Sequence, residues 1–254
     1  MEEEKGKGPQ TKLLQCEGLI VRIIKRDPKT ENTEFEVYTA NSEGEIVKPD
    51  PIFKGIETTP PTESIFDRTF TAPEHRKFNF RVLNKDKENK SMDDALFMEI
   101  AKTDDPKKSL YHVTSKDMSS EESIGTIECH VRRLHASFRV NGLDSAYVVE
   151  EQRPQSSALE FLMCCGFVSR IEPDELTIFE AEKVNGSRIE DPGKQLGGMS
   201  REPLGKIVKL KKKDAFSKAR DIFVSFPKSA YDEERSLLLA VTFLISARFF
   251  TRAV

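Results

Sequence analysis

The stretch SLLLAVTFLISARFF (236–250) is the most apolar window of the 254-residue chain and decides the fold. Acidic residues in YDEER (231–235) favour a helix N-terminus before it, and Arg248 and Arg252 suit the C-terminus. A helix of this length extends about 22 Å, less than the roughly 30 Å of a bilayer core. Because a helix that is apolar on every side is buried in protein or in lipid, we expect protein burial, with membrane insertion as the alternative. The apolar residues of this helix that we expect to be buried, or in the alternative inserted in the membrane, are Leu237, Leu238, Leu239, Val241, Phe243, Leu244, Ile245, Phe249 and Phe250.

Short apolar runs of alternating polarity fill most of the remaining chain. In KFNFRVL (77–83), Phe78, Phe80 and Val82 fall on one face, which is the period of two of a half-buried strand. Residues that favour tight turns separate these runs, so about a dozen strands in one antiparallel meander are predicted. The other runs are 19–24, 34–40, 95–100, 110–114, 124–140, 144–151, 158–168, 175–184, 204–210 and 221–226.

A meander of this length has two edges to protect, and closure into a barrel protects them most completely. The lumen of such a barrel is too wide for strand side chains alone to fill, and the apolar helix supplies the missing core. We therefore predict a mainly β protein, a closed antiparallel barrel of about 12 strands that encloses the C-terminal helix. Residues 1–12 are expected to form a disordered tail and residues 13–254 one barrel domain, with a proline-rich loop insertion at 48–66.

Composition excludes several classes of protein. Forty Lys and Arg against 43 Asp and Glu give a formal charge of -3, which argues against a general nucleic-acid binder. Four cysteines without CxxC spacing do not predict a structural zinc site. The N-terminus MEEEKGKGPQ lacks the apolar core of a secretory signal, so the cytosol or the cytosolic face of a membrane is the expected location. The scattered histidines do not group with a nucleophile, and an enzyme is not predicted.

The run KIVKLKKKDAFSKAR (206–220) holds seven cations in 15 residues. Such a patch attracts anionic lipid headgroups at about 1 kcal/mol per residue near the surface. A nuclear-localisation signal and a solvated turn are the two alternatives. The candidate lipid-binding residues are Lys206, Lys209, Lys211, Lys212, Lys213, Lys218 and Arg220. Cys164 and Cys165 follow an apolar run and are candidates for acylation.

Five stretches carry a resemblance that covers most of the chain. They are KFNFRVLN (77–84), IGTIECHVRRLHASFRV (124–140), EFLMCCGFV (160–168), GKIVK (205–209) and SFPKSAYDEERSLLLAVTFLISARFF (225–250). In sequence and in order they resemble the phospholipid scramblases, within the tubby-like superfamily. The resemblance implies a barrel around an apolar helix, located at the cytoplasmic face of a membrane, most naturally the plasma membrane. It also implies bidirectional movement of phospholipids between leaflets, in which no covalent bond changes and no catalytic residue is needed.

The resemblance implies calcium as a cofactor, but the chain departs from the family at the acidic loop that would bind it. Only Asp214 and Asp221 remain there, and a hard cation takes about six oxygen ligands. The cysteine cluster that carries palmitate in scramblases is also missing from 101–113. These departures support an alternative, a non-transporting tubby-like module that uses its basic run to bind phosphoinositide or another acidic partner, protein or nucleic acid, and moves between membrane and nucleus.

Overall fold

A computed structural model describes the chain at residue 13 and over residues 16–26, 32–58, 78–85, 95–103, 109–117, 120–131, 136–151, 174–181, 202–210 and 220–250. The expected tail at 1–12 lies outside them.

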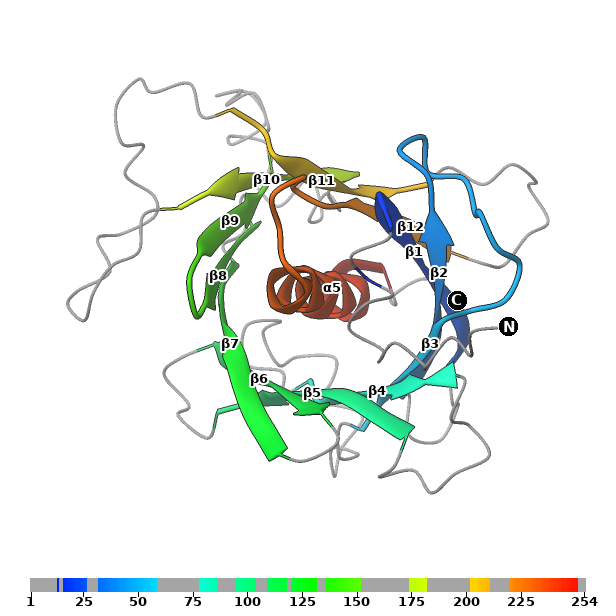
Figure 1. Cartoon of the computed structure of the whole chain (residues 1–254), viewed down its shortest axis with the longest axis horizontal. Helices are drawn as coiled ribbons and strands as arrows, with labels where there is room; N and C mark the ends of the chain where they lie inside the picture. The colour runs from blue at the N-terminus through cyan, green and yellow to red at the C-terminus, as the bar shows by residue number, and fades with distance from the viewer. Residues whose placement is uncertain are drawn as a thin grey trace, which may run out of the picture.

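Twelve strands form one closed antiparallel barrel, as predicted (Figure 1). Each strand pairs with its neighbours in sequence, and the first strand closes the wall by pairing with the last. The strands are β1 (Gly18–Arg26), β2 (Thr33–Ala40), β3 (Phe53–Glu57), β4 (Phe80–Asn84), β5 (Leu96–Lys102), β6 (Leu110–Asp117), β7 (Ser120–Val131), β8 (Ala136–Gly142), β9 (Ala146–Glu150), β10 (Glu175–Glu180), β11 (Gly205–Lys209) and β12 (Arg220–Ser225).

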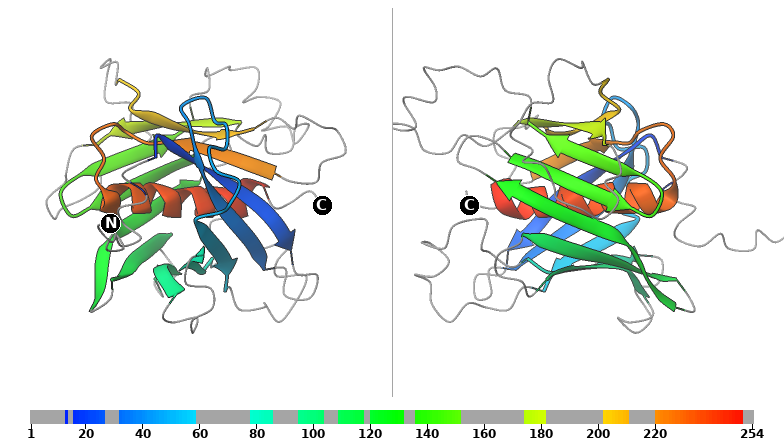
Figure 2. Two further views of the ribbon diagram at one scale, coloured as in Figure 1. Left: turned by 45° about the vertical axis from the view of Figure 1, so that its right-hand side comes forward. Right: turned by 90° about the vertical axis from the view of Figure 1, so that its left-hand side faces the viewer.

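The predicted C-terminal helix lies inside this wall, as both side views show (Figure 2). It consists of α5 (Asp232–Ile245), which continues as the π-helix η3 (Ser246–Phe250). Every residue of α5 except Glu233 is buried, so the expectation that the helix is buried in protein is confirmed. It begins at Asp232, before the apolar window, because the acidic first turn and the Tyr231 N–H···Glu234 bond of 3.0 Å favour a helix start there. Within the described residues, no helix is long and apolar enough to cross a bilayer.

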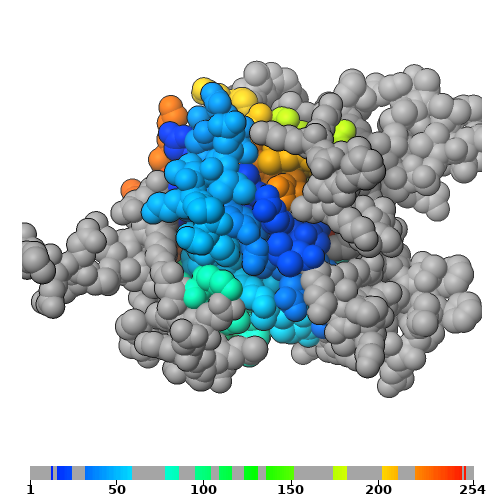
Figure 3. Space-filling model, turned by 90° about the vertical axis from the view of Figure 1, so that its right-hand side faces the viewer, coloured from blue at the N-terminus to red at the C-terminus, as the bar shows by residue number. Residues whose placement is uncertain are grey.

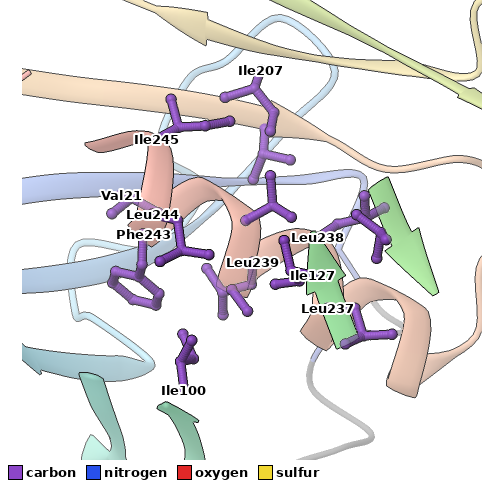
Figure 4. Packing of buried hydrophobic residues seen from close by; sticks show 14 of the residues in the cluster. Val21, Ile100, Ile127, Ile207, Leu237, Leu238, Leu239, Phe243, Leu244 and Ile245 are labelled. Carbon is purple, nitrogen blue, oxygen red and sulfur yellow. The ribbon is translucent and has the colours of Figure 1, made fainter. Parts of the chain in front are cut away.

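The helix and the wall form one apolar core (Figure 4). The ring of Phe243 lies 5.2 Å from that of Phe35 and 5.9 Å from that of Phe80, between centroids. Nearer the end of the helix, Phe249 meets Phe138 edge to face at 6.4 Å. Each such side chain contributes about 1.5–3 kcal/mol when fully buried. α5 supplies more residues to this core than any single strand does. The wall contributes Val21, Ile100, Ile127 and Ile207, among others, to this core.

Because α5 follows β12, the two rims of the barrel differ. The rim at which β1 begins, β12 ends and α5 starts is called the proximal rim, and the opposite one the distal rim. The segment between β2 and β3 leaves the proximal rim and folds back over the outside of the wall (Figure 3). There Gly44, with φ of +79°, lies against the ring of Phe223 and covers a small outer apolar cluster. That cluster consists of Ile20, Tyr38, Ala40 and Phe223.

The prediction of a loop over 48–66 is wrong for Phe53–Glu57, which form β3. The prolines of this segment obscured a short strand whose residues alternate between buried and half-buried positions. Gly55 faces the helix, and a Cβ atom built on it would lie 2.6 Å from Cε1 of Phe243. A residue without a side chain is therefore needed where the aromatic cluster fills the space. Residues 59–66 and the predicted strand at 158–168 lie outside the described residues, and β9 pairs directly with β10.

The contact between Gly55 and Phe243 gives a test of this packing. We expect Gly55→Ala to lower the free energy of unfolding by about 1–3 kcal/mol, because the added methyl group overpacks the core. The measurement is urea unfolding followed by circular dichroism. In a Phe243→Leu background the same substitution is expected to cost less, since the smaller side chain leaves room for the methyl group. An equal cost in both backgrounds would show that Phe243 is not the reason for the glycine.

Candidate functional site

The predicted basic run begins on β11, and the described cations of that run do not share a face. Lys206 is exposed and Lys209 is half-buried, with buried Ile207 between them. Because side chains alternate along a strand, residues three apart point to opposite sides of the wall. Arg220 begins β12, but its side chain lies outside the described set, as do Lys211, Lys212, Lys213 and Lys218. Of the seven predicted cations, Lys206 alone is placed on the outer surface.

Asp221, one of the two carboxylates assigned to calcium, accepts two hydrogen bonds from Arg22. The Nε atom of Arg22 lies 2.8 Å from Oδ1 and its Nη2 atom 2.7 Å from Oδ2. The hydrogen bond to Asp221 raises the pKa of Arg22 above its usual range. A calcium ion at Asp221 would have to displace this guanidinium, which binds both carboxylate oxygens.

The other calcium and acylation candidates are not placed, since Asp214, Cys164 and Cys165 lie outside the described residues. Within the described part of the chain, no three His, Cys, Asp or Glu side chains gather as a metal site. Calcium binding and acylation therefore stay predictions.

The Arg22–Asp221 pair belongs to a polar group on the outside of β12, β1 and β2. The guanidinium carbon of Arg22 lies 5.1 Å from the centre of the Tyr38 ring, and the Tyr38 hydroxyl donates to Glu36 at 2.5 Å. Register places Arg22 opposite both Asp221 and Glu36. This outer group therefore joins the first two strands to the last across the seam at which the barrel closes.

A second polar group lies at the proximal rim, around Glu234 in the first turn of α5. Its Oε2 atom accepts a bond of 2.9 Å from the Tyr147 hydroxyl on β9 and one of 3.0 Å from the Tyr231 N–H. Burial, followed by the hydrogen bond to Glu234, raises the pKa of Tyr147 to about 12. A buried carboxylate is costly unless it is paired, and here its partners fix the start of the helix to the wall.

Arg235, the next residue of α5, is buried and donates to three backbone carbonyls. Its Nε atom lies 2.9 Å from the Ala230 oxygen, and Nη1 lies 2.6 Å from the Leu13 oxygen and 2.7 Å from the Cys16 oxygen. The guanidinium carbon also lies 5.3 Å from the centre of the Phe226 ring. A guanidinium suits such a site because its donors point in fixed directions. Arg235 therefore ties the start of the helix to residues that precede β1.

Neither polar group was predicted as a site. The acidic residues at 232–234 predicted a helix start, but not which of them would bond to the wall. The sequence did contain a signal for these groups. Charged residues stand directly before the apolar window, and they must find partners if the helix is enclosed by the barrel. Chemically, the donors and acceptors named in both groups are engaged with one another. This arrangement suits holding segments of the barrel together, and it does not present a nucleophile beside a general base.

Comparison of the chain with family models, with curated proteins and with solved structures finds no match.

The bond between Tyr147 and Glu234 predicts how stability depends on pH. A phenol whose pKa is raised by folding contributes stability that is present below the unfolded value of 10.0 and lost as the pH rises toward about 12. We expect the free energy of unfolding to fall over this interval, and to fall less in Tyr147→Phe. At neutral pH the variant is expected to be less stable by about 1 kcal/mol, because it lacks the hydrogen bond.

Urea unfolding at pH 7 and at several values between 10 and 12 measures both effects. Tyr231→Phe, which changes a tyrosine that is 68% exposed, is the control for losing one phenol. If the wild-type protein and Tyr147→Phe decline in parallel above pH 10, Tyr147 does not hold its proton in the folded state.

Proposed function

We propose that this protein is a scramblase-like, tubby-like barrel that binds anionic phospholipid at the cytosolic face of a membrane. The observation that carries the proposal is the apolar helix enclosed by a closed wall of strands. Two stretches of the resemblance coincide with the elements that build this arrangement. GKIVK is β11 itself, and SFPKSAYDEER leads from the end of β12 into α5. The proposed relation to the scramblases depends on the helix and the wall together, because barrels without such a helix serve many different functions.

Binding, rather than movement of lipid, is the activity that the geometry favours. A headgroup that crosses a bilayer needs a polar path, and irregular or polar structure at membrane depth must line a cavity. Within the described residues, the middle of the barrel is filled by the buried apolar side chains of α5. The polar side chains Thr242 and Ser246 bond to carbonyls of the helix itself, at 2.8 and 2.6 Å. They do not line a path.

The basic run is the surface proposed for the headgroups. β11 ends and β12 begins at the distal rim. Lys211, Lys212, Lys213 and Lys218 come between these two strands in the sequence and lie outside the described residues. Lys206 lies on the outer face of the same strand pair. Several lysines near an anionic surface add about 1 kcal/mol each, an attraction that salt screens.

Flotation with vesicles tests the binding proposal. The protein is expected to float with vesicles that contain phosphatidylserine or a phosphoinositide, to stay behind with neutral vesicles, and to be released by high salt. Changing Lys211, Lys212 and Lys213 to Glu is expected to abolish flotation. The control is Lys48→Glu with Lys228→Glu, two exposed lysines beyond the proximal ends of the strands.

Two outcomes would contradict the proposal. If the wild-type protein fails to float with acidic vesicles, lipid binding is wrong. If the control variant loses flotation and the triple variant keeps it, the basic run is not the docking surface.

Bidirectional phospholipid movement is the second candidate function, and the order of the five scramblase-like stretches favours it. In vesicles that hold a labelled lipid, a scramblase accelerates dithionite bleaching of the inner-leaflet label. If the protein accelerates this bleaching, it moves phospholipid between the leaflets and does not only bind it. Flotation together with a bleaching rate that is unchanged with and without calcium would leave the protein as a binding module.

A further inference from the structure

One strand of the closed wall extends beyond its neighbour at the proximal rim. β7 is the longest strand, with 12 residues, and it pairs with β6 from its first residue, Ser120. Its pairing with β8 begins only at Gly125, which lies opposite Gly142, the last residue of β8. The stretch Ser120–Ile124 is called the β7 extension, and it projects from the ring of strands in Figure 1. It is paired on the β6 side, and within the described residues no strand covers its other side.

The backbone of the β7 extension presents hydrogen-bonding groups at this uncovered side. Further along β7, the N–H of Cys129 bonds to the Ser109 oxygen at 2.8 Å, which is on the β6 side of the strand. Backbone groups alternate in direction along a strand, and the register shift against β6 makes Ile124 one extra residue. Counting back through this bulge directs the N–H and C=O groups of Glu121 and Ser123 away from β6, toward the uncovered side. Unpaired groups of this kind are a template for an added strand.

The turn after β8 lies next to the end of the β7 extension. The Gly142 N–H bonds to the Ser145 oxygen at 2.9 Å, and the chain returns there into β9. Leu143, in this turn, is 67% exposed. Because Gly142 lies opposite Gly125, a strand that continued the line of β8 along the β7 extension would begin beside Leu143. An apolar residue at that end of the added strand would cover part of the exposed leucine.

The charge of this region favours a basic partner over a second copy of the chain. KDMSSEES (116–123) holds three acidic residues and one lysine, and the exposed Asp144 follows Leu143. Two copies that paired their β7 extensions antiparallel would place Glu122 or Glu121 opposite its own counterpart. Like charges directly opposite each other destabilise a strand pair, whereas lysine or arginine opposite glutamate stabilises it. The charge therefore complements a basic segment of another protein.

We propose that the β7 extension is a docking edge at which a basic, extended segment of a partner protein adds as a strand. The segment pairs with the outward backbone groups of Glu121 and Ser123, along the line that β8 leaves at Gly142. Main-chain hydrogen bonds supply affinity, and alternate side chains of the segment supply specificity. The barrel stays closed throughout, because this edge lies beyond the part of β7 that β8 covers. This inference does not rest on the proposed lipid function.

Fluorescence anisotropy with labelled, capped peptides tests the proposal on the full-length protein. The probe is KVKVKVK, and EVEVEVE is the control for charge. We expect the lysine peptide to bind at least about tenfold more tightly than the glutamate peptide. Ser123→Pro removes one outward N–H and places a ring at the edge without breaking a bond to β6. It is expected to weaken binding of the lysine peptide at least about tenfold.

Ser123→Ala is the matched control, since it removes the same hydroxyl and keeps the backbone N–H. It is expected to bind the lysine peptide as the wild-type protein does, and circular dichroism checks that both variants keep the barrel. The proposal is overturned if the wild-type protein binds neither peptide, if it binds both alike, or if the proline and alanine variants bind the lysine peptide equally well. If the protein alone forms a dimer that Ser123→Pro abolishes, the occupant is a second copy and the basic partner is wrong.

Amide hydrogen exchange needs no variant and covers the case in which Ser123→Pro does not fold. Saturating KVKVKVK is expected to slow exchange at the N–H groups of Glu121 and Ser123 at least about tenfold, because an added strand bonds to them. The Glu122 N–H points to β6, so its exchange is expected to change much less. Equal slowing at all three residues, or none, would show that the peptide does not add as a strand at this edge.

Discussion

The enclosure of one apolar helix by a closed wall is the constraint on which the rest of this structure depends. A twelve-stranded barrel leaves a lumen that strand side chains alone cannot fill, and a helix as apolar as α5 has no stable place in water. Each element supplies what the other lacks. The details of the wall then follow from the helix, such as a glycine where β3 meets the Phe243 ring.

Polar groups determine how the helix sits within this apolar interior. Hydrophobic contacts act in all directions and would allow the helix to slide or rotate, whereas hydrogen bonds fix particular atoms. Glu234 binds Tyr147 of the wall, and Arg235 binds backbone before β1. Both lie in the first turn, so the helix is anchored at the proximal rim and packs by shape beyond it.

The architecture could be predicted from the sequence because it depends on periodicity and on one extreme window. Alternation indicated the strands, and the length of the meander indicated closure. β3 was missed because proline and glycine are read locally as loop residues, although Gly55 is explained by Phe243, which lies 188 positions later in the chain.

The candidate site was less predictable than the fold, because its contacts also join residues that are distant in the sequence. Nothing near Asp221 shows that its partner is Arg22, which is 199 residues away, and a run of lysines does not show that Lys206 and Lys209 point to opposite sides.

The closure between β1 and β12 also shapes how the chain reaches its native state. The first strand of the barrel to be synthesised pairs with the last, and the helix that fills the interior follows that last strand. During synthesis, eleven strands are therefore exposed with neither a closed seam nor a core. Proteins dominated by contacts distant in sequence fold slowly, and their open edges invite aggregation. Until translation has passed α5, nascent chains of this protein therefore carry strand edges and apolar strand faces that only the completed barrel covers.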